Sequence, residues 1–181
     1  FSLLPLPPVE NWSVADATND NVDYPPSPYP PPLPLGVSSS ALGSPTSATT
    51  YMYNATTLID PTRAVSARTS IPANALPSDT AVREYPVRKT RALAVSIPKR
   101  HSYVVAFAVS WIAKTGTSPR ASAPITMKIA DRRIAAGDTI YHVVSKRLTR
   151  VGTAKANGTA KITFTTDSTF IVAAPSKSKH R

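Results

Sequence analysis

The stretch from Ser102 to Ala113 constrains the fold most, because it contains no charged residue, proline or glycine. Its two alternating sets of side chains are both apolar or small: Tyr103 and Trp111 belong to one set, and Ile112 to the other. Successive side chains of a β-strand point to opposite faces of a sheet, and β-branched and aromatic residues favour strands. The stretch therefore predicts a central strand covered on both sides. A buried helix is the alternative, because periodicity does not separate the two in a short apolar run.

Short strand-like runs with turn signals between them follow one another from Thr46 onward. The expected strands are 49–59, 64–71, 80–88, 92–97, 102–113, 124–130, 139–151, 158–165 and 169–174. Two of these runs alternate cleanly and place Lys128 and Lys161 on their polar faces, and Asn157-Gly158 predicts a hairpin connection. No stretch keeps a helical period. The pattern predicts an all-β fold, an antiparallel sandwich or jelly roll of about eight or nine strands.

Residues 1–45 differ from the rest and hold 11 of the 19 prolines. Proline fixes φ and lacks an N–H, so residues 24–34 are expected to be extended. Trp12 and its apolar neighbours are costly to leave in water, which predicts an arm that docks on its own domain or on a neighbouring copy. The P-x-x-P spacing near Pro25 could suit an SH3-type groove, but no Arg or Lys accompanies it, so a stiff spacer is favoured. We therefore expect a Pro-rich N-terminal arm and linker at 1–45, and a β-domain with a short basic C-terminal tail at 46–181.

Charge is segregated along the chain. Residues 1–62 hold five of the ten acids and no Lys or Arg, while the other five acids and all 21 basic residues lie from Arg63 onward, so the formal charge is −5 before Arg63 and +16 after it. Such a field attracts polyanions, although a merely soluble basic surface is the alternative. The basic clusters fall at strand ends and turns rather than on one helix, which favours phosphate contacts without base reading. The expected nucleic-acid-binding residues are Arg88, Lys89, Arg91, Lys99, Arg100, Arg132, Arg133, Lys146, Arg147, Arg150, Lys177, Lys179 and Arg181.

Patterns for other chemistry are weak or missing in the sequence. There is no cysteine, so neither a disulfide framework nor a thiolate metal site is expected. The three histidines are isolated and no serine lies in a nucleophile elbow, so we expect no catalytic residues, no enzyme activity and no cofactor. Asp16, Asp20 and Asp23 could supply oxygen ligands to Ca²⁺, but their spacing fits no EF-hand loop and a solvated turn is favoured, so we expect no metal site. No signal peptide or membrane span is visible.

The strand that ends with Val109–Ala113 is followed by a loop rich in Ser, Pro and Thr, through Thr117–Pro119 and Ala123–Thr126. With this segment and its extended arm, the chain resembles the coat proteins of small icosahedral RNA viruses, loosely those of tymovirus-like plant viruses. The resemblance implies a jelly-roll fold that assembles into a shell. The chain departs from the tymovirus-like coats in charge, because they are near neutral. Other small RNA-virus coats usually have a basic N-terminal arm, whereas this arm is acidic and the tail is basic.

These observations lead us to expect a viral coat protein that self-assembles into an icosahedral shell and packages RNA through non-specific phosphate contacts. Its expected partners are further copies of itself, alone or with other coat subunits, and genomic RNA, with no membrane. Its expected location is the virion, and the host cytoplasm during assembly. The alternatives are a cellular nucleic-acid-binding β-domain of the OB or ribosomal type, and a secreted β-sandwich that binds polyanions.

Overall fold

A computed structural model of the chain describes residues 31–32, 42–60, 65–87, 95–144 and 146–176. In these residues the structure contains ten β-strands and no helix. The strands are β1 (Thr46–Thr49), β2 (Thr56–Asp60), β3 (Val65–Ile71), β4 (Ala81–Pro86), β5 (His101–Ile112), β6 (Ile125–Asp131), β7 (Thr139–Val144), β8 (Arg147–Thr153), β9 (Thr159–Phe164) and β10 (Ser168–Pro175). Within the described ranges, no helix is long and apolar enough to cross a membrane.

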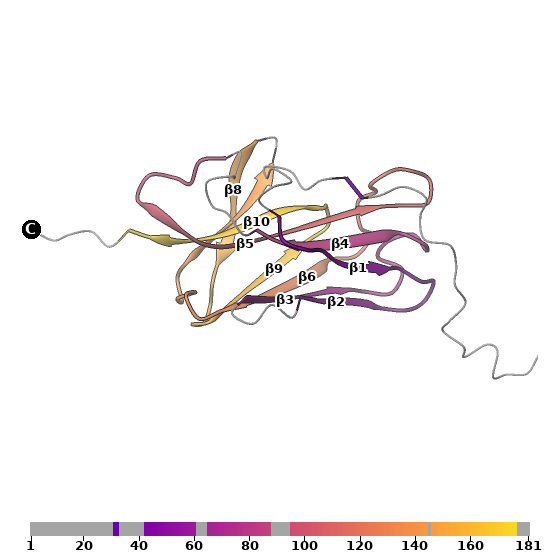
Figure 1. Cartoon of the computed structure of the whole chain (residues 1–181), viewed down its shortest axis with the longest axis horizontal. Helices are drawn as coiled ribbons and strands as arrows, with labels where there is room; N and C mark the ends of the chain where they lie inside the picture. Colours follow the sequence, from indigo (N-terminus) through magenta and orange to yellow (C-terminus); the bar gives the residue numbers. More distant parts are fainter. Residues whose placement is uncertain (1–30, 33–41, 61–64, 88–94, 145, 177–181) are drawn as a thin grey trace, which may run out of the picture.

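The strands form two antiparallel sheets that pack face to face (Figure 1). One is six-stranded, in the order β1-β4-β5-β10-β7-β8, and the other is four-stranded, in the order β2-β3-β6-β9. Each sheet turns one face toward the other sheet, which explains why β6 and β9 alternate between buried apolar and more exposed polar residues. The prediction of an all-β chain built as two antiparallel sheets is confirmed.

The strand pairing is nested. From β5 to β10, the first strand pairs with the last (β5 with β10), the second with the fifth (β6 with β9), and the two middle strands with each other (β7 with β8). The first four strands repeat this scheme, because β1 pairs with β4 and β2 with β3. In both groups, successive pairs alternate between the two sheets. The described strands therefore form two nested antiparallel groups, in each of which successive pairs belong to different sheets.

β5 is the central strand that the sequence predicts, and both of its faces are covered. Phe107 and Trp111 are fully buried in the main core between the sheets, whereas Ala106 belongs to a second buried cluster on the outer face of the six-stranded sheet. The register with β10 shifts between Val172 and Ala173, where β5 accommodates one extra residue. Strict alternation would place Tyr103 on the same face as Trp111. Because such a bulge reverses the alternation, Tyr103 packs with the second cluster instead.

Three expected strands differ in the structure. The run 49–59 is divided into β1 and β2 by residues 50–55, and 139–151 is divided into β7 and β8 by a tight hairpin. Where it is described, the run 92–97 has no strand, although Val95 covers the second buried cluster. The tight turn at Asn157-Gly158 does form, but it leads from β8 in one sheet to β9 in the other. β9 pairs with β6 instead, because this pairing turns its apolar face toward the core.

Most of the predicted arm lies outside the described residues. Of residues 1–45, the structure describes Pro31, which is buried, Pro32, which is exposed, and residues 42–45. Leu42 forms a bridge with Val87, and the N–H of Gly43 donates a 2.7 Å hydrogen bond to the carbonyl oxygen of Pro86. Leu42 and Gly43 are therefore already part of the described sandwich, just before β1.

Candidate nucleic-acid interface

The loops that precede β5, follow β6 and follow β8 meet at one end of the sandwich (Figure 1). The register places them there. His101 at the start of β5 lies opposite Pro175 of β10, and Ala173 of β10 lies opposite Thr139 of β7, which pairs with Thr153 at the end of β8. The end of β6 lies beside the start of β9, which follows the loop after β8. The expected residues Lys99, Arg100, Arg132 and Arg133 are carried on two of these loops and are exposed. The third loop carries Lys155, which the sequence analysis left out.

Lys99 and Arg100 form the corner of a tight turn before β5. The N–H of His101 donates a 3.0 Å hydrogen bond to the carbonyl oxygen of Pro98, and Arg100 has a φ of 69°, which the third residue of a type II turn requires. The N–H of Ser176 donates a 2.6 Å hydrogen bond to the carbonyl oxygen of Arg100. The last described residue therefore lies beside this basic turn, and the chain continues from there.

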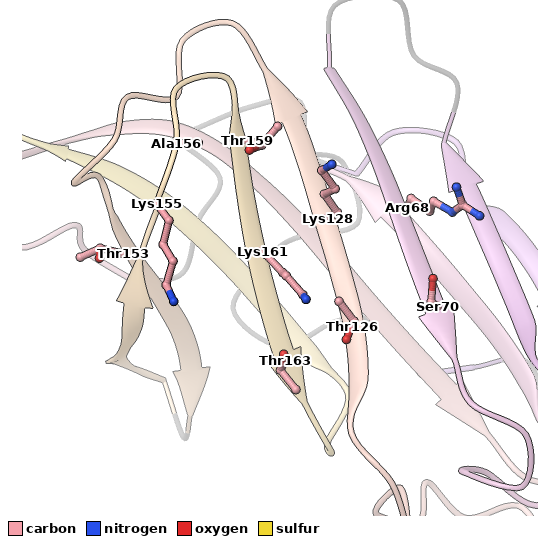
Figure 2. A pocket seen from close by; sticks show the side chains of 10 residues that line it. All are labelled: Arg68, Ser70, Thr126, Lys128, Thr153, Lys155, Ala156, Thr159, Lys161 and Thr163. Carbon is pink, nitrogen blue, oxygen red and sulfur yellow. The ribbon is translucent and has the colours of Figure 1, made fainter.

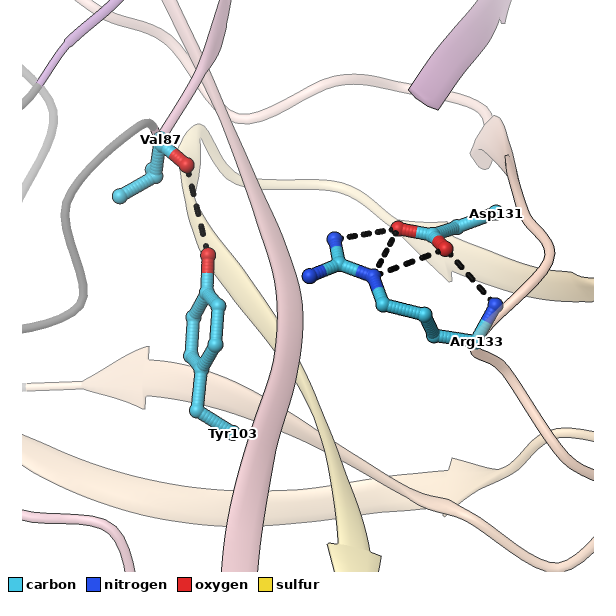
Figure 3. A network of polar contacts seen from close by, with 4 residues as sticks. All are labelled: Val87, Tyr103, Asp131 and Arg133. Carbon is cyan, nitrogen blue, oxygen red and sulfur yellow. Dashed lines mark hydrogen bonds and ion pairs between the residues drawn. The ribbon is translucent and has the colours of Figure 1, made fainter. Parts of the chain in front are cut away.

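Arg133 is held by the carboxylate of Asp131 (Figure 3). Its Nη2 lies 2.7 Å from Oδ2 of Asp131, and its backbone N–H donates a 2.8 Å hydrogen bond to Oδ1. Burial pushes the pKa of Asp131 upward, but the hydrogen bonds from Arg133 and the nearby charge of Arg132 outweigh it and hold that pKa below its ordinary value. Much of the charge of Arg133 is thus compensated, and Arg132 is the cation of this loop that is more available to a ligand.

Figure 3 also shows Tyr103, the β5 residue that the bulge reorients. Its hydroxyl donates a 3.3 Å hydrogen bond to the carbonyl oxygen of Val87. Burial raises the pKa of Tyr103, so the phenol keeps its proton. This side chain fixes the start of β5 against the end of β4 and supplies no charge to the interface.

Lys146, Arg147 and Arg150 lie apart from this end, on the β7–β8 hairpin at the edge of the six-stranded sheet. All three are exposed, and Lys146 has a φ of 63° in the two-residue hairpin connection. The structure therefore does not bring every expected residue into one surface. Six further expected residues lie outside the described ranges: Arg88, Lys89, Arg91, Lys177, Lys179 and Arg181.

A second basic surface, which the sequence analysis did not single out, lies on the outer face of the four-stranded sheet (Figure 2). It is an open groove of about 680 Å³, which we call the basic groove. Its cations are Arg68 on β3, Lys128 on β6, Lys161 on β9 and Lys155 on the connection before β9. The remaining lining residues are small or carry hydroxyls: Ser70, Thr126, Thr153, Ala156, Thr159 and Thr163.

The alternation of β6 and β9 was the signal that could have found this groove, because it placed Lys128 and Lys161 on polar faces. What the sequence could not show is that these two strands are neighbours. In the structure Lys128 lies directly opposite Lys161 on one side and Arg68 on the other. The groove thus depends on strand pairing between segments far apart in the chain.

The possible metal ligands that the sequence offered are not among the residues that the structure describes. In these residues no three His, Cys, Asp or Glu side chains gather as a metal site would require. Asp16, Asp20 and Asp23 lie outside them.

Comparison with known proteins finds no matching family model, no similar curated protein and no similar solved structure.

Proposed function

We propose that this chain is the coat subunit of a small icosahedral RNA virus, in which a jelly-roll domain tiles the shell and basic surfaces hold the genome. The observation that carries the proposal is the nested pairing of β5 to β10. A jelly roll is an antiparallel ribbon of strand pairs wrapped so that successive pairs fall in opposite sheets, and viral capsid domains commonly use this fold. Here the pairs β5·β10, β6·β9 and β7·β8 fall in alternate sheets, and this alternation supports a jelly roll with three such pairs.

The distribution of charge supports the second half of the proposal. Copies of a domain with a formal charge of +16 after Arg63 repel one another when they are packed together, unless a polyanion neutralises them. Exposed cations such as Lys99, Arg100 and Arg132 sit on loops and could each contact one phosphate without reading a base. The subunit would then act in the virion, and in the host cytoplasm while shells assemble, with no reaction catalysed.

Particle formation tests this function directly. The full chain would be purified and mixed with RNA of about 1,000 nucleotides, of natural or scrambled sequence, and examined by size-exclusion chromatography and negative-stain imaging. We expect closed particles that contain either RNA. A protein that stays monomeric while it binds RNA would instead indicate a nucleic-acid-binding β-domain, and a monomer that binds sulfated glycans but no RNA would indicate a polyanion-binding sandwich.

The role of the tail can be tested in the same preparation. Replacing Lys177, Lys179 and Arg181 by Ala removes three charges that no described strand requires. Each phosphate contact to a single strand contributes about 0.7 to the slope of log affinity against log salt, so the slope should fall by about two units. An unchanged slope would show that the tail does not contact RNA, and a flat salt response of the unaltered protein would argue against RNA packaging altogether.

A further inference from the structure

We propose that the basic groove on the outer face of the four-stranded sheet is a binding site for a chain of phosphates, which lies across strands β3, β6 and β9. The site itself is argued from the geometry of the groove. That RNA supplies the phosphates rests on the function proposed above, and inorganic polyphosphate has the same chemistry.

The cations of the groove form a row. Arg68 on β3 lies directly opposite Lys128 on β6, which lies directly opposite Lys161 on β9. Neighbouring strands are about 4.8 Å apart, so the three side chains leave the sheet at short and regular intervals. Like charges directly opposite one another on adjacent strands destabilise a sheet. The folded chain therefore carries an electrostatic cost at this row, which an anion in the groove would remove.

No acidic side chain whose placement the structure describes forms an ion pair with this row. The two ion pairs found there join Lys114 to Asp79 and Arg133 to Asp131, and neither involves a cation of the groove. None of the groove's lining residues is acidic. Lys155 adds a fourth charge, since its side chain descends beside β9 toward the level of Lys161 (Figure 2). The local excess of positive charge is thus left for a ligand to balance.

A row of hydroxyls runs parallel to the row of cations. Thr126 on β6 lies directly opposite Ser70 on β3 and Thr163 on β9, and each of these residues is two positions from the cation of its own strand. Hydroxyl groups are frequent hydrogen-bond donors to phosphate oxygens. Two parallel rows, one of cations and one of hydroxyls, both cross the strands. They favour an elongated ligand lying across the sheet over a single compact anion.

The lining also indicates what the site would not recognise. It contains no aromatic side chain, so it offers no platform on which bases could stack. It contains no carboxylate to accept hydrogen bonds from bases or to hold a metal ion. The groove should therefore bind phosphates with little dependence on base sequence, through contacts that weaken steeply as salt is added.

The test compares two double variants of the full chain. Lys128→Gln with Lys161→Gln neutralises the centre of the groove. Lys114→Gln with Arg120→Gln removes the same charge from the loop between β5 and β6, whose residues do not line the groove, and serves as the matched control. Binding is measured over a series of salt concentrations with two probes, a single-stranded RNA of about 20 nucleotides and inorganic polyphosphate.

We expect the groove variant to bind both probes about tenfold more weakly at low salt, with a salt slope lower by about 1.4 units, while the control stays close to the unaltered protein. Thermal unfolding provides a second readout. Polyphosphate should raise the melting temperature of the unaltered protein and of the control. It should raise the melting temperature of the groove variant much less. Without ligand, the groove variant should melt no lower than the unaltered protein, because the opposed charges are gone.

The outcomes separate this site from the proposed function. If the groove variant and the control bind both probes equally well, the site is refuted, and RNA packaging through the loops and tail can still hold. If polyphosphate binds in the groove and RNA does not, the site stands and its link to a genome is refuted. Groove-dependent binding to anionic vesicles, with neither probe bound, would overturn the proposal in favour of a membrane surface.

Discussion

The imidazole ring of His142 stacks on the phenyl ring of Phe170, with ring centroids 5.1 Å apart and planes inclined by 25°. Phe170 in turn packs on Phe164, and Phe164 on Trp111, so that an aromatic cluster joins β7 and β10 to β9 and β5. The two sheets are tied together through this cluster. His142 is its one titratable member, so we expect the packing of the sheets to depend on pH.

Stability should therefore fall in mildly acidic solution. Burial lowers the pKa of His142 below its ordinary value of 6.5, because the ring is partly removed from water. A histidine with a depressed pKa binds its proton more readily in the unfolded chain. Protonation of His142 therefore destabilises the folded state. This loss of stability is absent above about pH 7 and grows as pH falls through 6.5 toward the pKa of His142 in the folded protein. Chemical unfolding of the unaltered protein at several pH values between about 5 and 8 should show this loss.

His142→Phe is the matched control for this effect, because it keeps a ring against Phe170 and removes the proton site. Its stability should be nearly flat over the same pH range. An equally steep loss in this variant would assign the effect to other groups.

Trp111 should be among the most costly side chains to remove. It is fully buried, and its indole N–H donates a 2.8 Å hydrogen bond to the carbonyl oxygen of Pro119. The hydroxyl of Ser118 donates a 2.6 Å hydrogen bond to the backbone carbonyl oxygen of Trp111. Trp111→Ala should lower the free energy of unfolding by about 3–5 kcal/mol, and Phe107→Ala by a similar amount. Denaturant titration measures both.

Trp111→Phe separates packing from the hydrogen bond to Pro119. It keeps most of the buried ring but loses the donor, so we expect a smaller loss of about 1–2 kcal/mol. If Trp111→Ala melted like the unaltered protein, the position of this side chain in the core would be wrong.

The pair of Asp131 and Arg133 should stabilise the fold at neutral pH and lose its effect in acid. The Asp131 side chain is 1% exposed and that of Arg133 is 57% exposed, so solvent screens one partner only. Because the pKa of Asp131 is lowered on folding, its contribution is present above the unfolded pKa of about 3.9 and disappears as pH falls through the folded pKa.

Asp131→Asn should cost about 1–2 kcal/mol at pH 7, after allowance for the exposed arginine, and should make the acid limb of the stability curve shallower. Unfolding curves from about pH 7 to pH 2 measure both changes. Equal acid limbs for variant and unaltered protein would contradict the assigned role of this carboxylate.

Deleting residues 1–41 should leave the sandwich stable and impair its assembly. Of the residues described in this region, the deletion removes Pro31 and Pro32 and keeps residues 42–45, which include the bridge between Leu42 and Val87. Melting should therefore change little, whereas particles in the imaging assay should become rarer or different in size if the arm ties neighbouring copies together. Normal particles from the shortened chain would exclude that role, and a collapse of stability would show that the arm belongs to its own domain.

The local features of the fold could be predicted from the sequence because they depend on neighbouring residues. A strand with two apolar faces must lie in the centre of a sheet. The run 102–113 therefore predicted the central strand β5, although the sequence does not show which strands pair with it. Alternation in β6 and β9 gave the direction of Lys128 and Lys161, since successive side chains of a strand point to opposite faces. Charge is a property of composition, and it indicated a polyanion without any structure.

Only the tertiary structure decided which strands are neighbours and in what register. Lys128 and Lys161 are far apart in the chain, and they meet because pairing β6 with β9 buries Met127 beside Ile162 in the core. The bulge in β5 is likewise invisible in its sequence, yet it moves Tyr103 to the other face. Register is set by the burial of distant apolar faces against one another, so a surface built across several strands exists only once the core has formed.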